Sequence, residues 1–214
     1  GNKLYNFTAK ETLSIMQSLY ENHKYLTYPR TDSRYLTGDI IETLGDRVKA
    51  CGVGPYSHLA AKILKDKIKG NKNFVDDSKV TDHHAIIATE ERVILSRLND
   101  REKKIYDLVV KRFLAVLYPA FEYEEISLNV KIGEEFFIAK GKTILKPGWK
   151  EVYDNKYQDD DRDENEVKDQ ILPNIKKGDI IKINELVGTK GYTRPPAFFN
   201  EASLLSAMEN PAKY

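Results

Sequence analysis

The spacing of the apolar residues changes at Pro119, and that change limits the folds available to this chain. Before Pro119, apolar residues recur three and four positions apart, which is the period of amphipathic helices. After Pro119, residues 126–132 alternate between apolar and polar side chains, which is the period of a strand with one buried face. A helical half followed by a β half predicts an α+β, multi-domain chain.

Four helices are predicted in the first half. Thr8 followed three residues later by Glu11 is a capping-box signature, which predicts a helix over residues 9–22. A second helix is predicted over residues 39–50, with Gly52 just beyond it as a left-handed C-terminal stop. The other two are predicted from a start after Ser57, with four lysines on the exposed side, and from a cap at Asn99 and Asp100 to Tyr118.

The β half is predicted to contain a hairpin and one further strand. Gly133 and Glu134 separate the alternating residues 126–132 from residues 136–140, which suits a tight turn between antiparallel strands. The apolar residues of 181–186 predict the further strand: Ile181, Ile183 and Leu186. After it, Asn200 is expected to cap a last helix, which would take up residues 201–209.

Residues 154–169 are acidic and contain almost no apolar side chains. This composition favours an exposed loop. Four of its aspartates can also be interpreted as a metal cluster: Asp159, Asp160, Asp161 and Asp163. The loop is the stronger interpretation, because nothing near them in the sequence would hold four carboxylates in place.

Composition narrows the class of protein further. Hydrophobic residues are 41% and charged residues 31% of the 214 residues, and no apolar run approaches the roughly 20 residues that span a bilayer. The lone Cys51 excludes an intrachain disulfide and a multi-cysteine zinc site.

The charge is distributed unevenly along the chain. Residues 1–118 hold 20 basic and 15 acidic residues, a net +5, whereas the remainder holds 14 and 18, a net −4. A basic first half suits a polyanionic partner, but the charge alone is weak evidence, and without motifs ordinary surface charge is the stronger interpretation.

The most informative stretch is residues 26–36. In an extended segment residues two apart point to one side, so Tyr28 and Arg30 are expected to face one site, and Pro29 favours that extended backbone. A tyrosine can act as a covalent nucleophile if a cation stabilises its phenolate, and a guanidinium can also bind a phosphate through two hydrogen bonds. The alternative is a strand-end tyrosine beside a surface arginine, and Tyr-x-Arg alone favours that alternative.

Two other segments contain residues that suit chemistry or a domain boundary. In residues 81–89, His83 and His84 stand together before an apolar step, and a histidine there can donate a hydrogen bond to a phosphate oxygen. The pair can also be metal ligands or simply structural, although adjacent histidines point in different directions. Residues 190–205 combine basic residues, Pro195-Pro196 and aromatics before the last helix, which by itself indicates only a boundary between a sheet and a new helical domain.

Taken in this order, the three segments resemble the type IA DNA topoisomerases. Residues 28–36 are similar to the active-site signature of that family, most closely in its topoisomerase III branch, and residues 82–87 are similar to the second motif of the branch. A proline usually follows that motif; Ala88 stands here, and we expect the departure to alter a loop rather than the chemistry. Gly148-Trp149 and residues 194–205 also fit the pattern of the family.

The resemblance implies a role for each site residue. Tyr28 would attack a DNA phosphodiester and form a 5′-phosphotyrosine link with a free 3′-hydroxyl. Arg30 would stabilise the phenolate and the scissile phosphate, His83 would contact that phosphate, and Asp32 would orient Arg30 or another basic neighbour. Contacts to DNA would come from further basic residues in the same motifs: Arg34, Lys190 and Arg194.

The resemblance also implies a domain organisation. A mostly helical domain with the tyrosine would span residues 1–118, an antiparallel β arch that hinges a gate would span residues 119–193, and residues 194–214 would begin another helical domain. Family members carry a TOPRIM domain that binds Mg²⁺, and nothing in this chain matches it. The chain is therefore interpreted as a central fragment that is inactive alone, with no metal site of its own.

The expected activity of the parent protein is ATP-independent cleavage, passage and religation of a DNA strand. Its partner would be single-stranded or negatively supercoiled DNA in the cytoplasm, with no membrane involved. Two other interpretations stay open: a non-catalytic DNA-binding module of a degenerate homologue, and an unrelated α/β domain with a structural tyrosine. DNA cleavage by the full-length protein would exclude the first, and measurable DNA affinity would exclude the second.

Overall fold

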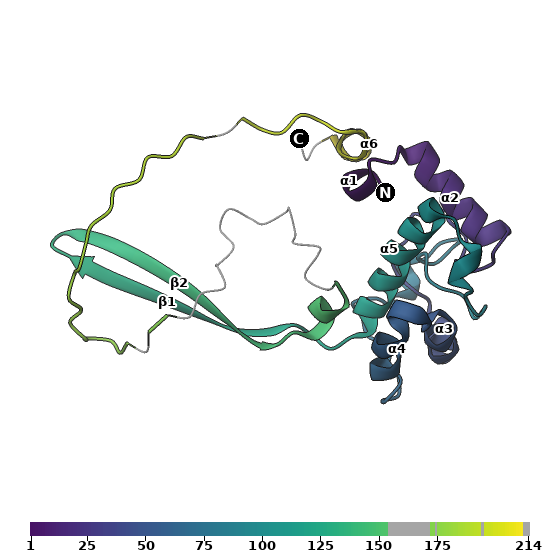
Figure 1. Cartoon of the computed structure of the whole chain (residues 1–214), viewed down its shortest axis with the longest axis horizontal. Helices are drawn as coiled ribbons and strands as arrows, with labels where there is room; N and C mark the ends of the chain where they lie inside the picture. The colour runs from purple at the N-terminus through teal and green to yellow at the C-terminus, as the bar shows by residue number, and fades with distance from the viewer. Residues whose placement is uncertain (154–171, 174, 194, 212–214) are drawn as a thin grey trace.

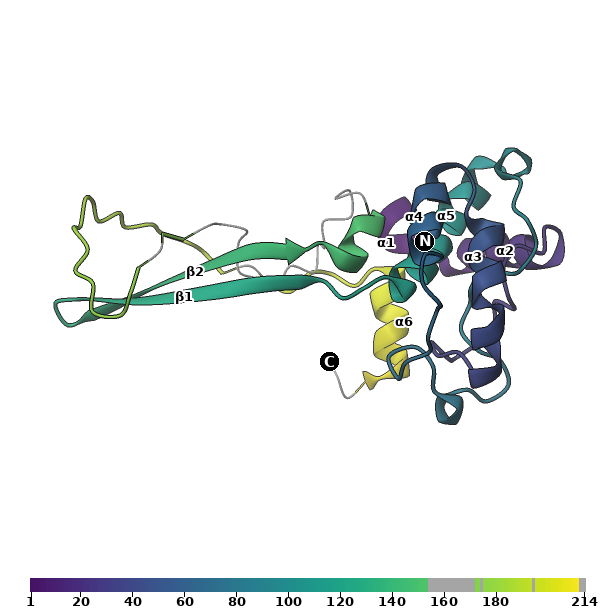
Figure 2. The same cartoon turned by 90° about the horizontal axis from the view of Figure 1, so that it is seen from below.

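The computed structural model describes residues 1–153, 172–173, 175–193 and 195–211. A helical body lies at one end, and a long β-hairpin projects from it (Figures 1 and 2). Residues 175–193 run in an extended path past the hairpin and back toward the body, where the last helix lies beside the first (Figure 1). The predicted α+β class is thereby confirmed.

The helical body, residues 1–118, consists of nine helical elements. Four are α-helices of at least one and a half turns, one is a single short turn, and four are 3₁₀ helices. In chain order they are α1 (Asn2–Tyr5), α2 (Ala9–Glu21), η1 (Gly38–Thr43), α3 (Leu44–Cys51), η2 (Gly54–Tyr56), α4 (Ser57–Ile63), η3 (Asp77–Lys79), η4 (Leu95–Arg97) and α5 (Asp100–Leu117).

Capping boxes start both long helices; the sequence predicts the box at Thr8 and, for the second helix, a cap at Asn99 and Asp100. At α2, the backbone N–H of Glu11 donates to the Thr8 hydroxyl at 3.1 Å, and the Glu11 carboxylate accepts from the Thr8 N–H at 2.9 Å. The hydrogen bond from the Thr8 backbone lowers the pKa of Glu11, and a further hydrogen bond from the Arg101 side chain adds to this effect. Together with smaller contributions they bring the pKa to about 2. Asn99 and Glu102 form the equivalent pair of bonds at α5.

The predicted helix over residues 39–50 is two elements, because η1 precedes α3. The predicted left-handed stop at Gly52 is wrong, since its φ is −74°. Close packing requires a glycine there instead. A Cβ atom at Gly52 would lie 2.5 Å from the Ala60 Cβ and 2.9 Å from the Val48 carbonyl oxygen, so α4 could not approach α3 as it does.

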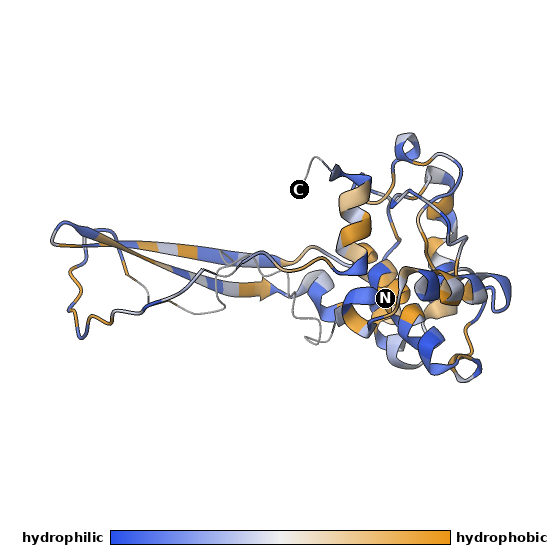
Figure 3. Cartoon of the chain, turned by 90° about the horizontal axis from the view of Figure 1, so that it is seen from above, coloured by the Kyte–Doolittle hydropathy of each residue, from blue (hydrophilic) through white to orange (hydrophobic). Residues whose placement is uncertain are grey.

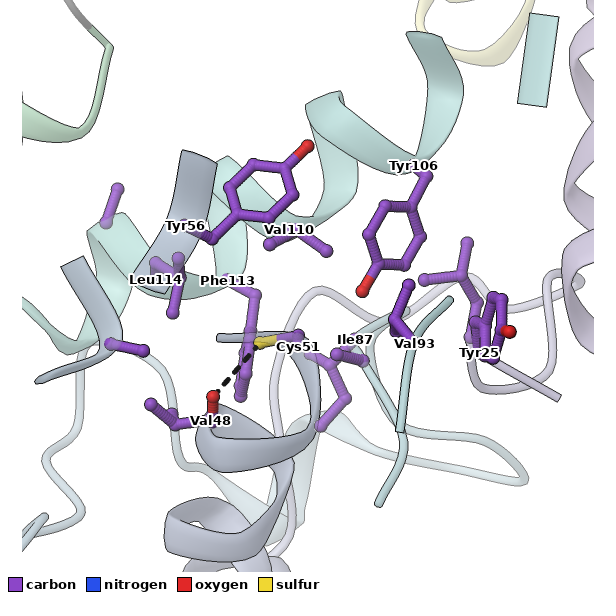
Figure 4. Packing of buried hydrophobic residues seen from close by; sticks show 14 of the residues in the cluster. Tyr25, Val48, Cys51, Tyr56, Ile87, Val93, Tyr106, Val110, Phe113 and Leu114 are labelled. Carbon is purple, nitrogen blue, oxygen red and sulfur yellow. Dashed lines mark hydrogen bonds between the residues drawn. The ribbon is translucent and has the colours of Figure 1, made fainter. Parts of the chain in front are cut away.

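The core lies where α5 packs against α3, α4 and the segments that follow them (Figure 4). Tyr106, Val110 and Leu114 of α5 are fully buried, as are Val48 and Cys51 of α3. Burial raises the pKa of the Cys51 thiol to about 12, and its sulfur lies 3.6 Å from the Val48 carbonyl oxygen. Cys51 is thus an apolar core residue with no reactive thiolate at neutral pH.

Tyr106 offers a test of this core. Its hydroxyl is buried and has no hydrogen-bond partner among the described residues, and burial raises its pKa. We expect Tyr106→Phe to leave the free energy of unfolding unchanged or to raise it by about 1 kcal/mol, because it removes an unsatisfied polar group. Urea denaturation measures this. Tyr56→Phe is the matched control and should lose about 1 kcal/mol, because the Tyr56 hydroxyl donates to Asp107 at 2.8 Å. A clear loss of stability in Tyr106→Phe would mean that the Tyr106 hydroxyl makes a stabilising hydrogen bond after all.

The predicted hairpin is confirmed and is longer than residues 126–140. It pairs β1 (Glu122–Ile132) with β2 (Glu135–Lys146) in antiparallel register around Gly133, whose φ of 62° permits the turn. Apolar and polar bands alternate along it (Figure 3). The predicted inner face is only half-buried, because the sheet has two strands among the described residues and no second layer of that part of the chain covers it.

The further strand predicted over residues 181–186 is wrong. The structure describes these residues without strand pairing. Ile181, Ile183 and Leu186 are 45%, 54% and 73% exposed. An alternating apolar pattern becomes a strand only when a neighbouring strand supplies hydrogen bonds, and here none of the described residues does so. The acidic residues 154–169 lie outside the described part of the chain.

The chain re-enters the body through η5 (Gly148–Tyr153). The Trp149 N–H donates to the Pro119 carbonyl at 3.0 Å, which closes the base of the hairpin, and Val152 is fully buried in the core. The last helix, α6 (Glu201–Glu209), begins at an Asn200 cap as predicted. It lies against α1, and the Ala9 N–H donates to Glu201 at 3.0 Å. None of the described helices is both long and apolar enough to cross a bilayer.

Candidate functional site

The site forms where two extended segments meet, residues 25–31 and residues 83–89. Leu26 forms an antiparallel bridge with Ala88. The Thr27 N–H donates to the Ile87 carbonyl at 3.0 Å, and the Thr89 N–H donates to the Tyr25 carbonyl at 3.1 Å. These bonds place the tyrosine motif beside the histidine motif, although Tyr28 and His83 are far apart in the sequence.

Two threonine hydroxyls fasten the segments together, and the sequence analysis did not identify them. The Thr27 hydroxyl accepts from the Ile87 N–H at 3.0 Å and donates to the Ala85 carbonyl at 3.3 Å. The Thr31 hydroxyl donates to the His83 carbonyl at 2.7 Å. The signal that could have revealed them is a pair of threonines flanking Tyr28 in a segment expected to be extended.

Arg47 is a third residue that the sequence analysis missed. It is buried in α3, and its guanidinium donates to the Ala88 carbonyl at 3.1 Å, to the Thr43 hydroxyl at 2.8 Å and to Glu90 at 2.8 Å. Burial lowers the pKa of Arg47, against the opposing effect of Glu90. Arg47 thereby fixes residues 88–90, the part of the second segment that bridges to Leu26.

Ala88 itself lies in this paired segment and is 1% exposed, so its departure from the usual proline falls at a bridged position and not in an open loop. Leu26 and Ala88 form the type of antiparallel pair in which neither residue exchanges ladder hydrogen bonds with the other. No described residue accepts a hydrogen bond from the Ala88 N–H. A proline, which lacks that N–H, would therefore leave the ladder intact, and the exchange changes little in the backbone.

The Tyr28 ring is held on two sides. The His83 ring lies 4.4 Å away, centroid to centroid, at an interplanar angle of 44°. The Tyr20 ring of α2 meets it edge-on at 5.5 Å and 80°. Tyr28 is half-buried, and no described residue hydrogen-bonds its hydroxyl. The ring is thus fixed while the oxygen stays available, an arrangement suited to a nucleophile.

Arg30, Asp32 and His83 line an open depression of about 460 Å³ beside this ring. Arg30 is exposed, and it forms no ion pair with any residue that the structure describes. His83 both contacts Tyr28 and lines the depression, so it connects the tyrosine to the arginine. The structure records no direct contact between Tyr28 and Arg30. An anion in the depression would meet Arg30 and His83 together, beside the carboxylates of Asp32 and Asp82.

The other predicted site residues are spread more widely. His84 is half-buried, and its Nδ1 lies 2.7 Å from the Ala85 carbonyl oxygen, so the two histidines do diverge. Arg34 is exposed, three residues beyond the segment that carries Tyr28. Lys190 is exposed in the extended segment 175–193 and does not line the depression, and Arg194 lies outside the described residues. Within the described ranges, no three His, Cys, Asp or Glu side chains gather as metal ligands would.

Comparison with known proteins places this geometry in a family context. The family model described as DNA topoisomerase matches residues 1–211. A DNA topoisomerase 3 from a strain of Bacillus cereus is 64% identical over 214 residues, which are 100% of this chain and 29% of that protein. A DNA topoisomerase 3 of Bacillus subtilis is 54% identical over the same 214 residues, again 29% of that protein.

A solved structure is also similar. Full-length topoisomerase I from Thermotoga maritima matches 80% of this chain and 26% of its own, with a TM-score of 0.51 and 21% identity, which supports the fold alone. The chain spans 29% of the length of the curated relatives it matches.

Proposed function

Because the chain belongs to the type IA DNA topoisomerases, in the topoisomerase III branch, we propose that it carries the nucleophile of an ATP-independent reaction that cleaves, passes and religates one DNA strand. The single observation that carries the proposal is the contact of the Tyr28 ring with His83, at the edge of the depression that Arg30 lines. A nucleophile, a cation and a hydrogen-bond donor meet there around a space that is open to a phosphate.

The chemistry that these residues support is a transesterification. The Tyr28 oxygen attacks the phosphorus of a phosphodiester, loses its proton, and displaces the 3′ oxygen, which leaves as a hydroxyl after it takes up a proton. The new bond is a 5′-phosphotyrosine. Arg30 neutralises charge on the phosphate and on the phenolate, and His83 donates a hydrogen bond to a nonbridging oxygen. Religation reverses the exchange, so that one ester replaces another and no ATP is needed.

The remaining roles are carried over from the resemblance of these residues to the motifs of the family. Asp32 lines the same depression as Arg30 and would orient it or a basic neighbour. Arg34, Lys190 and Arg194 would contact the DNA backbone outside the scissile phosphate. The described residues offer no group of ligands that would hold Mg²⁺, so we assign the metal that the family implies to acidic residues of a TOPRIM domain elsewhere in a longer polypeptide.

The proposal extends to organisation and setting. The helical body of residues 1–118, the arch of 119–193 and the residues from 194 onward would act as separate domains, joined to the further domains of the longer protein. DNA, single-stranded or negatively supercoiled, would be the substrate, in the cytoplasm. On its own this chain would not relax DNA, because Tyr28 would lack the acid, lysine and metal expected from the TOPRIM domain.

A chimera tests the reaction. The 29% of the Bacillus cereus relative that matches this chain is replaced by the chain itself, which is 64% identical to it. Incubated with Mg²⁺ and a single-stranded oligonucleotide and then denatured, the chimera should retain a 3′-end label but not a 5′-end label, because the link is to the 5′ phosphate. Binding without any retained label would favour the alternative, a non-catalytic DNA-binding module of a degenerate homologue.

The chain alone should bind single-stranded DNA weakly, and its affinity should fall as salt rises. The net +5 of residues 1–118 and the exposed Arg30 and Arg34 motivate this expectation, since phosphate contacts release counterions. Fluorescence anisotropy of a labelled oligonucleotide, titrated at several salt concentrations, measures it. No binding even at low ionic strength would count against DNA as the substrate of this part of the protein.

A further inference from the structure

A second cavity, of about 450 Å³, lies at the junction between the helical body and the hairpin. The end of α4 and the residues after it form one wall, and the end of α5 with Tyr118 and Pro119 forms another. It shares no lining residue with the depression beside Tyr28. We call it the junction cavity.

Lysines dominate the wall that the end of α4 and the residues after it form: Lys62, Lys65, Lys67 and Lys69. The Lys62 ammonium already has partners within the chain: it forms an ion pair with Glu151 and lies 5.4 Å from the centroid of the Tyr118 ring. The other three are exposed, and no residue in the described part of the chain forms an ion pair with them. Asp66 is the acid among the lining residues, so positive charge prevails there.

Ordinary helix chemistry explains only part of this cluster. Lysines near the C-terminus of a helix interact favourably with its dipole, and this accounts for Lys62 and Lys65. Helix α4 ends at Ile63, so Lys67 and Lys69 lie beyond the reach of its last turn. A polyanion that places several phosphates along them would complement their charge.

The junction cavity is far from the tyrosine. Helix α5 has Glu102 near its start, bonded to Ser18 and His23 on the α2 side of the site, whereas its last turn lines the junction cavity. The helix runs from Glu102 to Leu117 over about 22 Å, at the usual rise per residue. One phosphate cannot serve both places, but a continuous strand or a second segment of nucleic acid can.

We propose that the junction cavity is a second binding site for nucleic acid, which grips the phosphodiester backbone away from the scissile phosphate through Lys65, Lys67 and Lys69. The proposal rests on the function proposed above and goes further, because it assigns a separate contact. A backbone held there touches Leu117, Tyr118 and Pro119, where α5 gives way to the hairpin. The same bound strand therefore contacts the body and the root of the hairpin.

The test uses the 214-residue chain and the slope of log affinity against log salt. The triple variant Lys65→Gln/Lys67→Gln/Lys69→Gln should lower the magnitude of that slope by about 2 for a single strand of about 30 nucleotides, and by almost 3 for a duplex of that length, because each lost phosphate contact removes about 0.7 or 0.9. A lowered slope for one form of DNA alone identifies which form occupies the cavity. Lys65→Arg/Lys67→Arg/Lys69→Arg should keep the wild-type slope.

The matched control is Lys10→Gln/Lys49→Gln/Lys103→Gln, which removes the same charge from exposed positions elsewhere on the helical body. Its slope should stay close to that of the wild type. Equal slopes for the two glutamine variants would overturn the proposal, while the wild-type binding would still support DNA as the substrate. Absence of nucleic-acid binding by the wild-type chain would overturn both proposals. Circular dichroism verifies that the variants fold, as expected for substitutions of exposed side chains.

Discussion

Replacing Tyr28 by phenylalanine is expected to abolish covalent attachment of the chimera to DNA, and to leave folding and DNA binding nearly unchanged. The substitution removes only the oxygen that would attack the phosphate. The ring keeps its contacts with His83 at 4.4 Å and with Tyr20 at 5.5 Å, and no hydrogen bond to a described residue is lost. Retention of a 3′-end label after denaturation measures the covalent product, and anisotropy measures the binding.

Tyr35→Phe provides the matched control for this result. Tyr35 belongs to the same motif and is half-buried like Tyr28, but its hydroxyl lies 3.4 Å from the Lys79 ammonium and outside the depression. The same loss of one oxygen should there leave the covalent product intact. Adducts formed by the Tyr28→Phe variant would mean that another residue is the nucleophile.

Arg30→Lys is expected to slow covalent attachment by about 10²-fold, as for the loss of one charge-stabilising donor. Lysine keeps the positive charge, but a compact ammonium cannot contact a phosphate and a phenolate in one plane as a guanidinium can. Because Arg30 is exposed and lines an open depression, the substitution should not disturb the fold. Single-turnover rates of adduct formation, at DNA concentrations that saturate binding, separate this effect from weaker binding.

An arginine remote from the site shows whether the effect is specific. Arg97 is exposed in η4 and lines neither cavity, so Arg97→Lys should react at the wild-type rate. If Arg30→Lys also reacts at that rate, Arg30 is an ordinary surface charge, and the stabilising cation must come from another part of the protein.

The elements that could be predicted from the sequence are those with local causes. Capping boxes at Thr8 and Asn99 determine where α2 and α5 begin, and Gly133 determines where the hairpin turns. The failures concern longer-range effects. At Gly52 the closeness of Ala60, and not the backbone angle, requires a glycine. Residues 181–186 alternate like a strand, but a strand also needs a partner.

The residues of the candidate site can be proposed from the sequence, and their catalytic roles stay predictions, whereas their arrangement in space is not predictable in this way. The chemistry of Tyr28, Arg30 and His83 can be read from the residues and the resemblance, and the same-side argument for Tyr28 and Arg30 follows from extended backbone. Neither argument places His83 against the Tyr28 ring, because that contact depends on the pairing of two distant segments. The hydrogen bonds of Thr31 and Arg47 that support this pairing are likewise visible only in three dimensions.

The base of the hairpin has a mechanical consequence. The two strands join the body side by side, and the Trp149–Pro119 hydrogen bond links them there, with Gly148 in a backbone conformation of φ 48° beside the Ala120 carbonyl. A rotation about this narrow base would tilt the whole hairpin relative to the body. The 12-residue strand of the hairpin is about 40 Å long, so a tilt of about 10° at the base displaces the tip by about 7 Å. Small changes in the backbone torsions of the few residues at the base would therefore produce a large displacement of the hairpin tip.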